Sequence, residues 1–232
     1  MASTTSQFFR NAAIACFENA RALHTEALLL HSNQHFGRAL SLSIIGREEV
    51  AKGFLFVLAA LKLFPKMETR LISSDRNNPL RDHQLKQLME EYIGIGAWLV
   101  DDYFQILMAE TDFWGPIDDI EWLTDFFMAM RNNSSESDLL LSLKRNRIKK
   151  FSQLDLVSVS LTPEQKKHKG FYIDIVLPNL ITGPQDLSET DALIEMKDLE
   201  LSLQISSRLE GVVNSEEKWK LFEDSLRRKL KK

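Results

Sequence analysis

The chain has 232 residues, 44 % of them hydrophobic and 27 % charged, with a formal net charge of −4 and a pI near 5.8. This composition is that of a globular protein with enough apolar material for a core, and the acidic balance excludes a protein that coats nucleic acid indiscriminately. The single cysteine excludes an intrachain disulfide, no signal-peptide pattern opens the chain, and the most apolar stretch, 53–61, is too short for a bilayer, so we expect a soluble cytoplasmic protein without a membrane partner.

Two long helices are predicted for the start of the chain, because glycine and proline are scarce and apolar residues recur at helical spacing. Residues 6–30 carry one apolar stripe in alternating steps of four and three, made of Phe9, Ala13, Cys16, Ala20, Leu23, Ala27 and Leu30. Residues 36–64 carry a second stripe, and Pro65 is expected to end that helix. The polar link at 32–34 is short, so the two helices should form an antiparallel hairpin.

The remaining chain is predicted to be mainly helical, with one extended interruption. A polar loop at 66–80 precedes helices at 81–109, 119–130, 136–150, 188–209 and 215–231. Between them, 156–161 and 171–176 alternate or are rich in β-branched residues, and they predict two short strands or a hairpin-like excursion. The last two helices start at Ser188 and Ser215, and Asp191 completes a capping box with Ser188.

Together these elements predict one all-α domain over 1–232, an antiparallel helical bundle. The core of the bundle is expected in 1–150, the extended excursion in 151–185 and two C-terminal helices in 186–232. No internal repeat and no low-complexity tract interrupts this order.

Charged residues in the second helix form the first candidate site. In the apolar run from 39 to 61 the charged residues are Arg47, Glu48, Glu49 and Lys52, and Glu48 falls on the apolar stripe. A carboxylate there must be paired or protonated, because burying it alone is costly. Lys52 lies four residues after Glu48, in the favourable order for an ion pair. Two interpretations stay open: an internal ion pair that fixes helix register, and a polar pocket between helices.

The second candidate site is the segment that contains Arg76, Arg81, His83 and Lys86. Histidine can carry a proton near neutral pH, arginine can hold a phosphate at two points, and a helix N-terminus offers amides to an anion. This combination suits phosphodiester cleavage, and the alternative is a histidine that simply faces water. None of the five histidines follows a glutamate by three residues, as a di-iron bundle requires, so we expect no metal and no cofactor.

Basic residues also cluster in two places that suggest a contact with RNA or with an acidic protein. The first cluster holds Lys144, Arg145, Arg147, Lys149 and Lys150, and the second holds Lys166, Lys167, His168 and Lys169. Local positive charge attracts polyanions even when the net charge is negative. The alternative interpretation is that both clusters are solvated surface.

Three segments of the chain share their pattern with a known family. Residues 38–52 read RALSLSIIGREEVAK, residues 81–86 read RDHQLK, and residues 169–174 read KGFYID, with Pro184 downstream. In this order and spacing they resemble the RAxxLaixaxEExxK, RxHxxK and KxxglYvD segments of the AbiV family of bacterial abortive-infection proteins. The resemblance covers most of residues 8–195, and it implies a helical bundle of the HEPN type.

Many HEPN domains are ribonucleases of toxin–antitoxin and phage-defence systems, in which an arginine, four to six residues and a histidine meet at a dimer interface. The resemblance therefore implies His83 as general acid or base. Arg76 precedes it by six intervening residues, and Arg81 is the alternative because Arg76 falls in the predicted loop with Pro79 between. The implied pocket residues are Arg47, Glu48, Glu49, Lys52 and Lys86, and the implied RNA or partner contacts are Lys144, Arg145, Arg147 and Tyr172.

Three functions remain after these observations. The first is a phage-defence effector that cleaves RNA without metal, and the second is a non-catalytic defence protein that binds a phage or host protein and blocks translation. The third is a structural helical module whose polar residues only fix packing. The expected partners are an RNA substrate, a phage-encoded activator and a second copy of the chain in a homodimer.

Overall fold

A computed structural model of the chain describes residues 2–63, 69, 71–72, 80, 86, 119–132, 163–171, 174–177 and 180–230. The predicted helix at 136–150 and the predicted strand at 156–161 lie outside these residues, as does the predicted helix at 81–109 apart from Lys86. No described helix combines the length and the hydropathy that crossing a bilayer requires.

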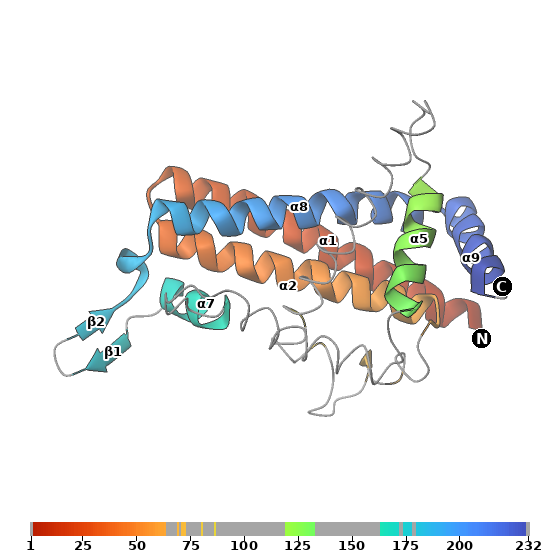
Figure 1. Cartoon of the computed structure of the whole chain (residues 1–232), viewed down its shortest axis with the longest axis horizontal. Coiled ribbons are helices and arrows are strands. Elements are labelled where there is room, and N and C mark those ends of the chain that lie inside the picture. The colour runs from red at the N-terminus through yellow and green to blue at the C-terminus, as the bar shows by residue number, and fades with distance from the viewer. Residues whose placement is uncertain are drawn as a thin grey trace.

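Three long helices form the body of the molecule (Figure 1). α1 (Ala2–Ser32) and α2 (Phe36–Ala60) make the predicted antiparallel hairpin, and α8 (Glu189–Val213) packs against both of them. α8 runs alongside α1 in the opposite direction. Arg10 near the start of α1 accordingly binds the carbonyl oxygen of Val213 at the end of α8. The all-α bundle predicted from the sequence is confirmed, and α8 takes part in its centre.

α2 ends in a backbone motif that the sequence does not predict. The Leu63 N–H bonds the carbonyl oxygen of Leu58, and the Lys62 N–H bonds that of Ala59, with Lys62 in the left-handed region at φ 55°. This is the Schellman motif, which usually places glycine at the left-handed position. α1 is followed by a second left-handed residue, Gln34 at φ 62°.

The helix predicted over 36–64 is therefore too long, and the assignment of its end to Pro65 is wrong. α2 stops at Ala60, because the left-handed turn at Lys62 has already taken the chain out of the helix. Pro65 is the clearest signal in the sequence for the end of a helix, but the Schellman motif before it ends α2 earlier.

An aromatic cluster fills the end of the bundle near the two termini, between α2, α5 (Asp119–Asn132) and α9 (Glu216–Leu230). Its fully buried rings are Phe54, Trp122, Phe126, Phe127 and Phe222. Phe54 of α2 lies 5.8 Å from Phe126 and 6.3 Å from Phe127, measured between ring centroids. Rings at such distances add attraction to the burial of their area, and they hold α5 to the hairpin. α5 confirms the helix predicted at 119–130.

The two C-terminal helices begin where their capping residues predict. The Ser188 Oγ accepts the Asp191 N–H at 3.2 Å, and the Asp191 carboxylate accepts the Ser188 N–H at 3.0 Å, which completes the capping box of α8. The Ser215 Oγ accepts the Lys218 N–H at 3.2 Å in the first turn of α9. α8 continues to Val213, four residues past the predicted end at 209.

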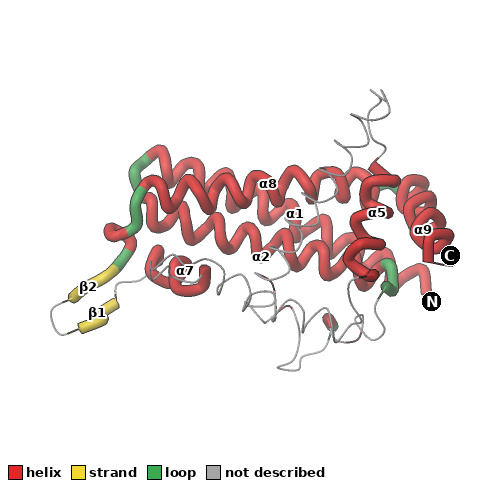
Figure 2. The backbone as a smooth tube through the Cα atoms, viewed as in Figure 1, coloured by secondary structure: helices red, strands yellow, loops and turns green. Residues whose placement is uncertain are grey.

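The segment before α8 differs from its prediction (Figure 2). α7 (Pro163–Phe171) is a helix inside the stretch 151–185, for which the sequence predicts extended chain. β1 (Asp174–Leu177) then pairs antiparallel with β2 (Leu180–Thr182), so the strand predicted at 171–176 begins three residues late, and η2 (Pro184–Asp186) follows. α7 has no apolar stripe from which a helix could be predicted. Its sequence is nevertheless compatible with a helix, because proline is favoured at the first helical position and the glutamate, glutamine and lysines that follow are good helix formers.

Candidate functional site

Among the described residues, Glu48 is a buried carboxylate that forms ion pairs with two lysines. It lies on α2 and is 3 % exposed, as its place on the apolar stripe predicts. The Lys167 Nζ, from α7, is 2.9 Å from its Oε1, and the Lys86 Nζ is 3.2 Å from its Oε2. Lys86 is itself buried at 3 % exposure. Glu48 is therefore buried and paired, and its partners come from outside α2, as the interpretation of a polar pocket between helices predicts.

The predicted pair of Glu48 with Lys52 is wrong. The Lys52 ammonium binds the carboxylate of Glu49, three residues before it on α2. Positions three and four apart are both neighbours on a helix, so spacing alone does not choose between the two carboxylates. Tertiary structure decides which carboxylate Lys52 binds, because lysines from outside α2 already form ion pairs with Glu48.

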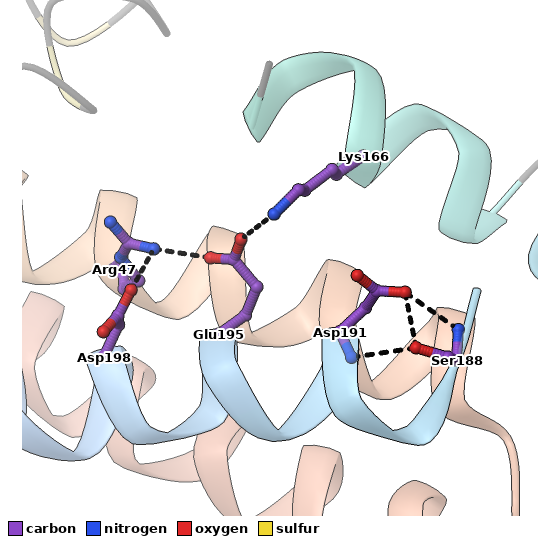
Figure 3. A network of polar contacts seen from close by, with 6 residues as sticks. All are labelled: Arg47, Lys166, Ser188, Asp191, Glu195 and Asp198. Atoms are coloured by element: carbon purple, nitrogen blue, oxygen red, sulfur yellow. Dashed lines mark hydrogen bonds and ion pairs between the residues drawn. The ribbon is translucent and has the colours of Figure 1, made fainter. Parts of the chain in front are cut away.

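A second group of charges joins α2, α7 and α8 (Figure 3). The Arg47 Nη1 lies 2.5 Å from the Glu195 Oε2 and 3.3 Å from the Asp198 Oδ2, and the Lys166 Nζ lies 2.9 Å from the Glu195 Oε1. The Glu195 side chain is 5 % exposed and is shared between an arginine and a lysine. Burying a carboxylate is tolerable when it is paired in this way.

Small residues allow α7 to lie directly on α2. A Cβ on Gly170 would be only 1.9 Å from the Ser41 Oγ and 2.2 Å from the Gly37 carbonyl oxygen, so no larger residue fits there without a shift. The Ser41 hydroxyl has the carbonyl oxygen of Lys167 at 2.8 Å and that of Gly37 at 3.0 Å as acceptors. This close approach brings the α7 lysines within reach of carboxylates that α2 and α8 bury.

The surroundings shift the proton affinities of two groups in the site. Burial lowers the pKa of Lys86, and the ammonium groups of Lys52 and Lys167 add to this effect, although Glu48 opposes it. Burial raises the pKa of Asp198, with Arg47 acting in the opposite direction. The site thus holds a lysine that releases its proton more readily than a surface lysine, which suits proton transfer.

Cys16, the single thiol of the chain, adjoins the Glu49–Lys52 pair from α1. Burial raises the pKa of Cys16 to about 12, with a smaller contribution from the Glu49 carboxylate. Cys16 belongs to the predicted apolar stripe of α1, but it is half-buried and lies at the edge of the polar site.

We expect the Cys16 thiol to resist alkylation in the folded protein. A thiol with a pKa near 12 is far less ionised at pH 8 than one with the ordinary pKa, so its reaction with iodoacetamide should be roughly a thousandfold slower than in the urea-unfolded chain. The rate is measured by mass spectrometry, with glutathione as the control for the reagent. Equal rates in the folded and the unfolded chain would contradict this environment.

The remaining predicted site residues lie outside the described part of the chain. These are His83, Arg81, Arg76, Lys144, Arg145, Arg147 and Tyr172. The structure therefore brings together Glu48 with Lys86, and Glu49 with Lys52, from the predicted pocket, whereas Arg47 binds Glu195 and Asp198 of α8. Lys166 and Lys167 are not simply solvated surface, because both bind buried carboxylates of the bundle, and their contact with RNA or an acidic protein stays a prediction.

Sequence reasoning missed two members of the site, Glu195 and Asp198. Glu195 could have been found by the signal that identified Glu48, since it lies on α8 between the buried residues Ala192 and Leu199. Asp198 carried no such signal, because half of its side chain is exposed and only the reach of Arg47 brings it into the site.

Comparison with known proteins gives one match. A family model described as HEPN_AbiV, AbiV, matches residues 8–200 of the chain. The match spans α1, α2, the segment with Lys86, α7 and the first half of α8, and so includes every polar residue of the site described above. No curated protein and no solved structure gives a significant match.

Proposed function

Because the chain belongs to the AbiV family of abortive-infection defence proteins, we propose that it stops phage multiplication by cleaving RNA without the help of a metal ion. His83 acts as general acid or base, and Arg81 or Arg76 holds the scissile phosphate. The buried charges of α2 shape the pocket beside them. Membership of the family supports the role in defence, and the proposed chemistry rests on His83 and the two arginines.

The burial of Lys86 against Glu48 is the observation that supports this chemistry best. Lys86 follows His83 by three residues in the sequence, and a chain of that length spans at most about 11 Å. Arg47 and Glu49, on either side of Glu48 in the sequence, belong to two further ion-paired groups, and the described members of the three groups are five basic side chains and four carboxylates. Basic side chains attract a phosphate diester, which supports RNA as the substrate.

A second candidate function is a non-catalytic defence protein that binds a phage or host protein and blocks translation. The mutual ion pairing of the described cluster favours this alternative, since Arg47 and Glu48 are already engaged within the chain. RNA cleavage needs a trigger, because an acidic chain with local basic groups does not hold RNA tightly. We propose a phage-encoded activator and a homodimer as the partners in either case.

Purified protein incubated with total RNA in the presence of EDTA tests the cleavage. We expect discrete RNA fragments, with His83→Ala slower by at least about a hundredfold, the usual contribution of a general acid or base. His35→Ala, a change at an exposed position in the turn before α2, serves as the matched control and should keep wild-type activity. If RNA stays intact with the wild-type protein, even when extract of phage-infected cells is added, the binding alternative holds instead.

A further inference from the structure

We propose that α7 is a detachable latch that keeps the defence activity off until it is released from α2 and α8. The ion pairs described for α7 are polar contacts with α2 and α8, and the buried carboxylates beneath it keep other partners when it leaves. The regulatory part of this inference rests on the proposed function, whereas the detachment itself is a property of the fold.

Polar contacts from the described side chains and backbone of α7 fasten it to the bundle. Lys166 binds Glu195 of α8 at 2.9 Å, Lys167 binds Glu48 of α2 at 2.9 Å, and the backbone carbonyl oxygen of Lys167 is 2.8 Å from the Ser41 Oγ. Each ammonium is a point charge on a flexible stem, so these contacts can be made and broken without repacking a core. They cover two carboxylates that are no more than 5 % exposed.

None of the described side chains of α7 belongs to the two buried hydrophobic clusters of the bundle. Phe171 is apolar but 38 % exposed, and the other described side chains of the helix belong to Lys166, Lys167 and His168. α8, by contrast, is fastened by fully buried residues such as Leu199 and Leu209. Elements with few buried apolar contacts are the ones that open at low free-energy cost.

The bundle keeps its buried charges paired when α7 leaves. Glu48 loses Lys167 but retains Lys86 at 3.2 Å, and Glu195 loses Lys166 but retains Arg47 at 2.5 Å. Stranding a single buried charge is strongly destabilising, and this duplication of partners avoids it. The closed and open states can therefore be close in free energy, as a two-state switch requires.

The contact of Gly170 with α2 provides a variant that opens the latch. Alanine at this position places its Cβ 1.9 Å from the Ser41 Oγ and 2.2 Å from the Gly37 carbonyl oxygen, and a backbone oxygen cannot move aside cheaply. Gly211 is the matched control, because a Cβ at that position of α8 meets nothing within 4 Å. Both changes replace a helical glycine by alanine, so they share the same effect on the unfolded chain.

Hydrogen–deuterium exchange of the full chain measures the latch directly. In Gly170→Ala we expect the α7 amides to exchange at least tenfold faster than in wild type, with the protection of α2 and α8 unchanged, and no such change in Gly211→Ala. If Gly170→Ala does not fold, the double variant Lys166→Gln/Lys167→Gln replaces it, with Lys197→Gln on the exposed face of α8 as control. Unchanged exchange of α7, or an equal loss of protection in α2 and α8, would overturn the proposal.

Expression in an uninfected bacterial host tests the regulatory part. The opened variant should arrest growth without phage, whereas wild type and Gly211→Ala should leave growth normal. Normal growth of a variant whose α7 exchanges freely would also overturn the latch as a regulator. Failure of the proposed function gives a different result, because the wild type would then give no protection against phage while the exchange of α7 is still measured independently.

Discussion

Replacing Glu48 by alanine is expected to destabilise the protein by about 3–5 kcal/mol, the cost of removing one partner from a buried ion pair. The change leaves the ammonium groups of Lys86 and Lys167 without their shared carboxylate, and Lys86 is only 3 % exposed. An ammonium in that position must lose its proton, draw in water or disrupt the packing. The free energy of unfolding in urea measures the effect.

Glu200→Ala is the control for this measurement. Glu200 lies on the exposed face of α8, so its loss should change the free energy of unfolding by no more than about 0.5 kcal/mol. A loss below about 1 kcal/mol for Glu48→Ala would show that the carboxylate is not the partner of two buried lysines.

The long helices were predictable because their signals are local and repeated. The apolar stripe of α1 extends over many turns, and the serine caps of α8 and α9 fix where these helices begin. The end of α2 was not predictable in this way, since Lys62 takes a left-handed conformation that sequence rules reserve for glycine. α7 was missed because a helix held by lysines shows no apolar period.

In the candidate site, the burial of Glu48 was predictable from a local pattern, whereas its partners were not. A carboxylate on an apolar stripe signals burial, and Glu48 is buried. Its partners come from α7, more than a hundred residues further along the chain, and from Lys86, so no local spacing rule reveals them. The local rule instead favours Lys52, which binds Glu49.

Lys86→Gln is expected to remove the protection against phage while leaving the fold intact. The change deletes a buried cation whose pKa is lowered by its surroundings, three residues after His83 in the sequence. Glu48 keeps Lys167 as a partner, so no carboxylate is stranded, and circular dichroism should match that of wild type. Lys197→Gln, on the exposed face of α8, is the control for the loss of one lysine charge.

Plaque counts on bacteria that express these variants test most directly whether the buried charges of α2 serve a defence protein. We predict that wild type and Lys197→Gln lower the plaque count by at least about a hundredfold relative to empty vector, and that Lys86→Gln gives a count close to that of empty vector. The acid–base and electrostatic contributions assigned to the pocket are of that size. Equal protection by Lys86→Gln and wild type, or no protection by wild type, would contradict the account.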